Sequence, residues 1–297
     1  MRVTRWVWAV AFAWPALAAG QVIQHSVSPA TVETVQMPAW LERDGRTQPL
    51  AVGMAVINGD KIRTGAQARV YLGIAEGSTV KLGENAVLHF YSRSLKPASN
   101  FRGALDVLTG AFRFTTHALQ RVRSQRDVAI RIGTATAGIR GTDLWGKSDA
   151  VRDLILLIEG NIEVRHAGAT FEMAEPLTYF SAPRNAPPQA LTKVDPESFK
   201  QWARETEVLP GDGAASRGGR WNVLLAQVAR QHEALEAYDK ARGAGYAAQV
   251  RVRPVVAGNG GPWRYEVVLA QLASEQEAAV VANRVNAQLG FAAVVAK

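Results

Sequence analysis

The side chains that most often carry enzymatic chemistry are scattered along this 297-residue chain. Its histidines never show the His-x-x-x-His spacing with which a helix presents two ligands to zinc. They are His25, His89, His117, His166 and His232. The chain has no cysteine, and Glu159 and Glu163 are separated by a Gly-Asn turn, so they form no evident acid–base pair. We therefore expect a non-enzymatic protein with no cofactor and no bound metal.

One arginine has an open role. Arg140 lies between two glycines in the run Gly138-Ile139-Arg140-Gly141-Thr142-Asp143. The glycines permit positive φ or close backbone approach, and the Thr and Asp that follow can bond nearby backbone groups. Arg140 either pairs with Asp143 as a structural residue or contacts an anionic or sugar ligand.

The stretch from Met54 to Val164 is rich in strand patterns. Short runs of alternating apolar residues recur about every 8 to 12 residues, which is typical of all-β domains. Turn pairs such as Asn58-Gly59 and Glu76-Gly77 separate them. The pattern predicts an all-β domain over residues 40–182, built as a sandwich or as a β-solenoid.

Two motifs in this stretch, at residues 56–65 and 134–143, resemble the FecR domain, a periplasmic β-domain first known from iron-citrate signalling regulators. The resemblance covers residues 50–166 and implies an interaction or signalling module. Those regulators also carry a cytoplasmic sigma-binding segment and a membrane span. The sequence shows neither, so we expect no direct control of a sigma factor.

The last part of the chain contains an internal repeat. Residues 221–229 and 265–273 are similar aromatic and apolar strand patterns, and each leads into an Ala-rich helical pattern. Each helical pattern ends in a Gly-aromatic-Ala-Ala corner, at Gly245 and at Gly290, where a helix must stop. Two tandem β-α-β halves predict a small α+β domain of β-α-β-β-α-β order, with both helices on one face.

This repeat resembles the SPOR domain (the sporulation-related repeat) over residues 219–297. The resemblance implies binding to septal peptidoglycan glycan strands stripped of stem peptides, and hence a link to cell division. The sheet face opposite the helices would hold the glycan, because the other face is buried. Strand alternation places the following residues on that open face: Asn222, Leu224, Arg251, Arg253, Arg264 and Glu266.

An alternative function stays open for the same sheet. Leu224 and Val268 are apolar replacements on the expected open face. An exposed apolar pair usually has a partner. The chain is then a periplasmic protein-interaction scaffold or signalling accessory, in which the sheet binds an envelope protein instead of peptidoglycan.

The start of the chain predicts the compartment. Arg2 and Arg5 precede an apolar run from Trp6 to Ala19, with small residues at Ala16 and Ala18. This is the pattern of a secretory signal peptide, which we place at residues 1–20. The run is shorter than the roughly 20 apolar residues of a membrane span. We expect a periplasmic protein with no span in its mature form.

Two segments should connect the domains across residues 183–218. Asp195 and Pro196 predict the start of a short helix over 196–208, with Phe199 and Trp202 packed against the β-domain. The run 210–219 is rich in Gly, Ser and Ala and predicts a flexible linker. The formal net charge of +8 suggests contact with anionic polymers or lipid headgroups, because an exported protein does not meet cellular nucleic acid.

Overall fold

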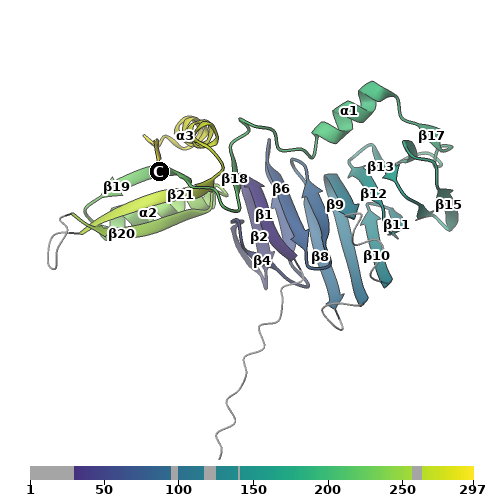
Figure 1. The fold of residues 1–297 in the computed structure, drawn as a ribbon, viewed down its shortest axis with the longest axis horizontal. Helices are drawn as coiled ribbons and strands as arrows, with labels where there is room; N and C mark the ends of the chain where they lie inside the picture. The colour runs from purple at the N-terminus through teal and green to yellow at the C-terminus, as the bar shows by residue number, and fades with distance from the viewer. Residues whose placement is uncertain (1–29, 95–99, 117–124, 140, 256–262) are drawn as a thin grey trace, which may run out of the picture.

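The computed structural model describes residues 30–94, 100–116, 125–139, 141–255 and 263–297. The predicted signal peptide at 1–20 and Arg140 lie outside the described residues. A two-layer β-domain occupies one end of an elongated molecule and a smaller α/β domain occupies the other (Figure 1). A segment with the helix α1 (Pro196–Arg204) runs back along the β-domain and joins the two.

The β-domain consists of two layers of strands that enclose an apolar core. The first layer contains β1 (Ala30–Gln36), β4 (Ala55–Val56), β6 (Arg69–Ile74), β7 (Ser78–Leu82), the second part of β9 (Asn100–Thr116), β12 (Asp143–Ser148), β13 (Arg152–Glu159), β16 (Thr178–Pro183) and β17 (Thr192–Lys193). The second layer contains β2 (Ala39–Arg43), β3 (Arg46–Pro49), β5 (Lys61–Thr64), β8 (Val87–Ser94), the first part of β9, β10 (Gln125–Ile132), β11 (Ala135–Ile139), β14 (Ile162–His166) and β15 (Ala169–Met173). Alternate residues such as Val70, Leu72 and Ile74 face the core, as the period of two requires.

The long strand β9 belongs to both layers. Its first part pairs with β8 and, in parallel, with β10, whereas its second part pairs with β7 and β12. The strand changes layers at Gly110, whose φ is +86°. A Cβ at this position would lie 2.5 Å from the Cα of Ala86. Only glycine fits there, because it tolerates both the positive φ and the close approach.

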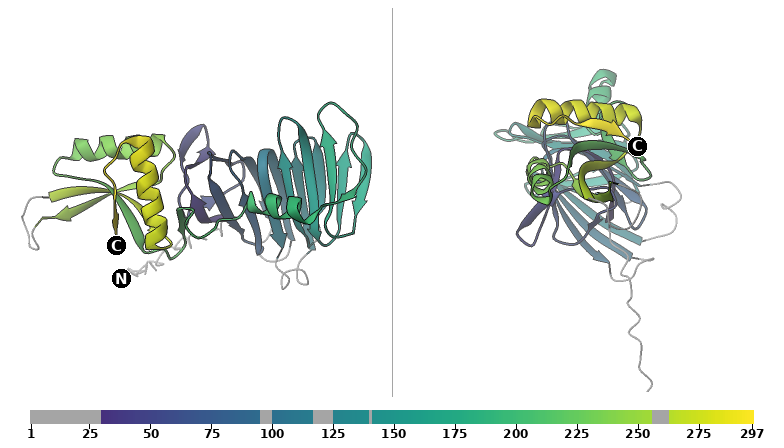
Figure 2. Two further views of the ribbon diagram at one scale, coloured as in Figure 1. Left: turned by 90° about the horizontal axis from the view of Figure 1, so that it is seen from above. Right: turned by 90° about the vertical axis from the view of Figure 1, so that its left-hand side faces the viewer.

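The all-β prediction is confirmed, and the structure combines the two predicted architectures. The two facing sheets are those of a sandwich. The chain nevertheless moves along the molecule by passing strands alternately to one layer and then to the other, as a solenoid does (Figure 2).

The C-terminal domain has the predicted β-α-β-β-α-β order. Its elements are β19 (Trp221–Val228), α2 (Gln231–Gly243), β20 (Ala248–Pro254), β21 (Trp263–Leu272), α3 (Glu275–Leu289) and β22 (Val294–Ala296). The antiparallel strands lie in the order β20-β21-β19-β22. Buried Val223, Leu225, Val267 and Leu269 form the core with residues of the two helices. Helix α3 ends at Gly290, which adopts the left-handed conformation with φ 64°.

The connecting helix is anchored by aromatic packing. The carboxylate of Asp195 accepts hydrogen bonds from the backbone amides of Glu197 and Ser198, at 3.1 and 2.9 Å, and so caps the helix. Trp202 stacks on the buried Trp145 with 5.2 Å between ring centroids. The helix ends at Arg204 rather than at residue 208, because the residues after it bond to the β-domain instead of continuing the helix.

The glycine-rich segment is held in place, in contrast to the flexible linker that the sequence predicts. The buried carboxylate of Glu277, in the first turn of α3, accepts hydrogen bonds from the backbone amides of Gly211 (2.6 Å), Gly213 and Ala214 (2.9 Å). The next residues form β18 (Ala214–Ser216), which pairs with β1 of the β-domain and with β21 of the C-terminal domain. The segment is therefore a shared strand between the domains.

Two further contacts close the junction. The guanidinium of Arg284 donates to the carbonyl oxygens of Met37 (3.1 Å) and Asp212 (2.9 Å). Gly245, with φ +86°, packs against Trp40, so that a Cβ there would lie 2.5 Å from the indole ring. The glycine that stops α2 thus also allows the two domains to touch, and the apolar core runs from one into the other.

We predict that Glu277→Gln exposes the segment to proteases. The substitution replaces one carboxylate oxygen with an NH₂ group that faces backbone N–H donors, so at least one of the three hydrogen bonds is lost. Loss of about 1.5–3 kcal/mol from hydrogen bonds to a charged group raises tryptic cleavage at Arg217 or Arg220 by on the order of tenfold. Time courses of limited proteolysis, followed by mass spectrometry, measure the rate.

Glu275→Gln is the matched control, because Glu275 is an exposed carboxylate in the same helical turn. It should leave the cleavage rate unchanged. Equal cleavage of the native chain and the Glu277 variant would show that the carboxylate does not hold the segment.

Candidate functional site

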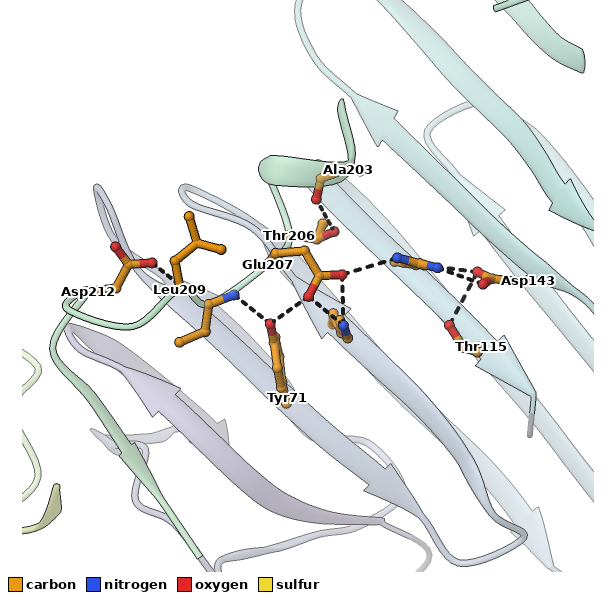
Figure 3. A network of polar contacts seen from close by, with 11 residues as sticks. Tyr71, Thr115, Asp143, Ala203, Thr206, Glu207, Leu209 and Asp212 are labelled. Carbon is orange, nitrogen blue, oxygen red and sulfur yellow. Dashed lines mark hydrogen bonds and ion pairs between the residues drawn. The ribbon is translucent and has the colours of Figure 1, made fainter. Parts of the chain in front are cut away.

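A network of polar side chains lies on the outer face of the first β-layer, where the chain passes from α1 to β18 (Figure 3). The carboxylate of Glu207 accepts hydrogen bonds from Lys81 Nζ at 2.6 and 2.8 Å, Arg113 Nη1 at 3.1 Å and the Tyr71 hydroxyl at 3.2 Å. The Tyr71 hydroxyl in turn accepts from the backbone amide of Val208 at 2.5 Å. These donors come from the neighbouring strands β6, β7 and β9 and point away from the core.

The network extends to the motif around Arg140. Arg113 donates from Nε and Nη2 to the two carboxylate oxygens of Asp143, at 2.9 and 2.7 Å. The Thr115 hydroxyl adds a bond of 3.2 Å to the same carboxylate. Arg113 is thus a described partner of Asp143, and the pairing of Arg140 with Asp143 that the sequence suggests stays a prediction. A ligand contact of Arg140 stays a prediction, since that residue lies outside the described part of the chain.

The pKa values follow from these contacts. Burial raises the pKa of Glu207, but the hydrogen bond and charge of Lys81, together with Arg113 and Tyr71, outweigh it and hold the pKa below the ordinary value of 4.5. Burial raises the pKa of Tyr71, and the Glu207 carboxylate adds to the effect. The charged form of Glu207 is thus favoured, and its charge is compensated. The arrangement anchors the segment after α1 and offers no unpaired group for catalysis.

One sequence motif typical of phosphate-binding loops is present, but the structure does not place it in a loop. Residues 141–148 match the Gly-x-x-x-x-Gly-Lys-Ser pattern of phosphate-binding loops, which join a strand to a helix. Here residues 143–148 are themselves the strand β12, paired with β9 and β13. Lys147 forms an ion pair with Glu205 at 2.9 Å, and Ser148 is fully buried. This segment therefore has no loop that wraps a phosphate.

The described residues offer little space for a small ligand or a metal. A cavity of about 20 Å³ at the domain junction, between Met37, Leu50, Ala215 and Leu269, has room for little more than a water molecule. Within the described ranges, no three His, Asp or Glu side chains gather as metal ligands. The helices in these ranges are too short or too polar to cross a membrane.

The structure brings together the residues predicted on the open face of the C-terminal sheet. Arg251 lies opposite Glu266, and Arg253 lies opposite Arg264, on the neighbouring strands β20 and β21. Glu266 forms ion pairs with Arg253 at 2.9 Å and Arg264 at 3.2 Å. Arg251 donates to the side-chain oxygen of Asn222 at 3.1 Å. Whether this polar face binds a glycan stays a prediction.

The apolar pair expected on that face is not exposed. Val268 is only 2% exposed, and Leu224 is half-buried. Val268 lies on the central strand β21, opposite Leu224 of β19 on one side and Gln249 of β20 on the other. Neighbours on both sides therefore shield it, whereas alternation alone says only which face it occupies. The interpretation of Leu224 and Val268 as an exposed pair is wrong.

We predict that Glu207→Gln lowers the free energy of unfolding by about 1–2 kcal/mol at neutral pH, because it removes the acceptor of two cationic side chains. The pKa of Glu207 is depressed in the folded chain, so this contribution is present above 4.5 and is lost as the pH falls through the folded value. The difference between native and variant chains should shrink below pH 4.5. Chemical denaturation over a pH series measures it.

Glu197→Gln serves as the control for this variant. Glu197 is an exposed residue of α1, and among the described residues its ion pair is with Lys200, three residues on. Exposed pairs of this kind contribute about 0.5 kcal/mol or less. If both variants behave alike, the network does not stabilise the fold.

Comparison with known proteins identifies part of the chain. No curated protein matches it. Two crystal structures of an anti-sigma factor candidate from Parabacteroides distasonis are similar in fold, each with a TM-score of 0.41. The first is 10% identical in sequence, and the alignment covers 66% of this chain and 95% of the crystallised chain. The second is 12% identical, and its alignment covers 77% of this chain and 91% of the crystallised chain. Neither the family match nor these structures supports the SPOR resemblance. Residues 60–163 match the family described as FecR protein, which confirms the FecR resemblance over this stretch.

Proposed function

We propose that this chain is a non-enzymatic scaffold of the bacterial cell envelope, a signalling accessory that holds a protein partner at a fixed position relative to its FecR domain. The observation that carries the proposal is the shared strand β18, hydrogen-bonded to β1 on one side and to β21 on the other. A scaffold requires such a fixed geometry, because it acts by where it places its partners.

The junction makes this coupling stiff. The three backbone amides bound by Glu277 and the two carbonyls bound by Arg284 tie α3 to the segment before β18 and to the β-domain. Domains joined only by a mobile linker move relative to one another by default, unless the interface is large and apolar. Here a continuous apolar core crosses the boundary. A partner on one domain is thereby held at a set distance from the other.

The open face of the C-terminal sheet is the surface we assign to the protein partner. It combines the half-buried Leu224 with three arginines and one carboxylate, and its residues belong to the neighbouring strands β19, β21 and β20. Arginine is enriched in protein interfaces, whereas small ligands prefer concave sites. Arg253 and Arg264 are already oriented by Glu266, so their guanidinium groups are held ready for carboxylates of a partner.

Glycan-strand binding by a SPOR-like sheet is the second candidate function. The specific observation in its favour is that the polar members of the predicted glycan face come together on one surface, with Arg251 bound to Asn222 and Arg253 to Glu266. Planar polar groups of this kind can bond sugar hydroxyls. The two functions use the same face, so one pair of experiments separates them.

We predict that a photo-cross-linking amino acid at Leu224 forms a discrete adduct with one envelope protein in intact cells. The same amino acid at Val151, which is 70% exposed in the β-domain, is the control and should not give that adduct. Gel mobility and mass spectrometry of the adducts identify the partner. Arg251→Ala with Arg253→Ala should reduce the yield of the adduct by on the order of tenfold, because two charged contacts are lost.

Sedimentation with purified sacculi tests the second candidate. A scaffold stays in the supernatant with or without amidase treatment of the sacculi. If the chain instead pellets with amidase-treated sacculi, and the double arginine variant does not, the sheet binds glycan strands. That result, together with the absence of a protein adduct, overturns the scaffold function.

A further inference from the structure

Strand β20 forms one edge of the C-terminal sheet (Figure 1). Among the described residues it pairs with β21 alone. Its first residues lie at the domain junction, where Gln249 lines the small cavity together with Leu50. At the other end Pro254 lacks a backbone N–H and ends the row of possible donors. Residues 250–253, which we call the β20 edge, therefore carry outward N–H and C=O groups that can pair with a further strand.

The side of the β20 edge that belongs to the open face of the sheet is basic. Arg251 and Arg253 are two residues apart, which is about 7 Å along an extended strand. Arg253 shares the carboxylate of Glu266 with Arg264. Arg251 donates to the neutral side-chain oxygen of Asn222. Three guanidinium groups thus stand against one carboxylate, so this side favours carboxylates at alternate positions of an added strand.

The other side of the β20 edge is apolar. Val250 packs partly against the core, whereas Val252, two residues on, is 54% exposed. Val252 lies opposite Tyr265 of β21, and its other flank is the free edge. An apolar residue on an added strand would cover it, as cross-strand neighbours do within a sheet. A strand that alternates carboxylate and apolar side chains therefore matches both sides of the edge at once.

We propose that an extended segment of the protein partner, in which carboxylates alternate with apolar residues, adds to β20 as a further strand. This inference rests on the proposed function and names the element and the chemistry by which the partner is held. Backbone hydrogen bonds attract any extended chain, and the side chains decide which chain fits. Arg251 and Arg253 belong both to the open face and to this edge, so the two assignments describe one partner.

The same charges disfavour a second copy of this chain as the occupant. An antiparallel pair of β20 strands centred on Arg251, Val252 or Arg253 would place arginine opposite arginine. Like charges in directly opposed positions destabilise a strand pair, and charged edge residues hinder such self-pairing in many proteins. A strand that carries carboxylates replaces each of these repulsions with a charge-assisted contact. The edge is therefore selective for an acidic strand.

Fluorescence anisotropy of labelled peptides with the full chain, at low ionic strength, tests the proposal. The probe is a heptapeptide in which glutamate and valine alternate, and we expect it to bind. Lysine in place of glutamate should weaken binding by on the order of tenfold, because like charges then meet. A peptide of the same composition, with its glutamates and valines in separate blocks, should bind more weakly than the alternating one. The alternating peptide N-methylated at every residue should not bind, because it has no backbone donors.

Arg253→Glu reverses one charge of the edge. It places glutamate opposite Arg264, and opposite charges in this position stabilise a strand pair. The variant should bind the glutamate peptide on the order of tenfold more weakly than the native chain does, and the lysine peptide more tightly. Arg165→Glu is the matched control, since Arg165 is an exposed strand arginine of the β-domain in an ion pair with Glu163. It should change neither affinity, and circular dichroism should show both variants folded.

Failure of the native chain to bind the glutamate peptide overturns the proposal. Undiminished binding of the N-methylated peptide overturns strand addition. Equal binding of the alternating and block peptides, or of the native chain and the Arg253 variant, overturns the matching of side chains. A dimer of the native chain that the peptide dissociates, seen by analytical ultracentrifugation, would assign the edge to a second copy instead.

The proposed function and the strand addition fail separately. An adduct at Leu224 in cells, without binding of the glutamate peptide, overturns the strand addition and leaves the scaffold function in place. Binding of the peptide, without any adduct at Leu224, supports the strand addition and contradicts the scaffold function.

Discussion

The path of the chain between the two domains depends on one buried carboxylate. Glu277 is 6% exposed and has no cationic partner among the hydrogen bonds described for it; its charge is met by three backbone amides from the glycine-rich segment. A buried charge is costly unless it is hydrogen-bonded, so the carboxylate and the segment require each other. Once Gly211, Gly213 and Ala214 are fixed, β18 can pair with β1 and β21 at once. Without this contact the two domains would share only part of their junction.

The network of Glu207 acts in the same way a few residues earlier. It ties the chain after α1 to three neighbouring strands of the β-domain, while Trp202 and Trp145 anchor the helix itself. The path from α1 to β18 is therefore fixed by one aromatic stack and two carboxylates. Both carboxylates accept from groups distant in the sequence, so the ordered path is a tertiary effect. Local propensity alone would leave a run of this composition as loop.

The difference between local patterns and tertiary contacts explains which features could be predicted from the sequence. Strands such as β6 and helices such as α3 follow from patterns within a few residues, and so do the stops at Gly245 and Gly290. Packing of Phe199 and Trp202 on the β-domain also follows, because an aromatic pair on one face of a short helix must be buried somewhere. The composition of the segment 210–219 predicts a flexible linker, and this prediction is wrong. Gly211 and Gly213 adopt positive φ in an ordered path, and glycine serves this purpose as readily as it serves flexibility.

The surfaces were harder to predict because exposure depends on where neighbouring elements end. Alternation assigned Val268 and Leu224 to the open face correctly as to side, but Val268 is buried by its position on the central strand. The same alternation gives Val252 and Trp263 the inward side, and both are nevertheless exposed. Trp263 lies beyond the last pair between β19 and β21, and Val252 lies level with that pair on β20, the strand at the edge of the sheet. The edge and the end of the sheet, rather than residue type, therefore decide the exposure of these two side chains.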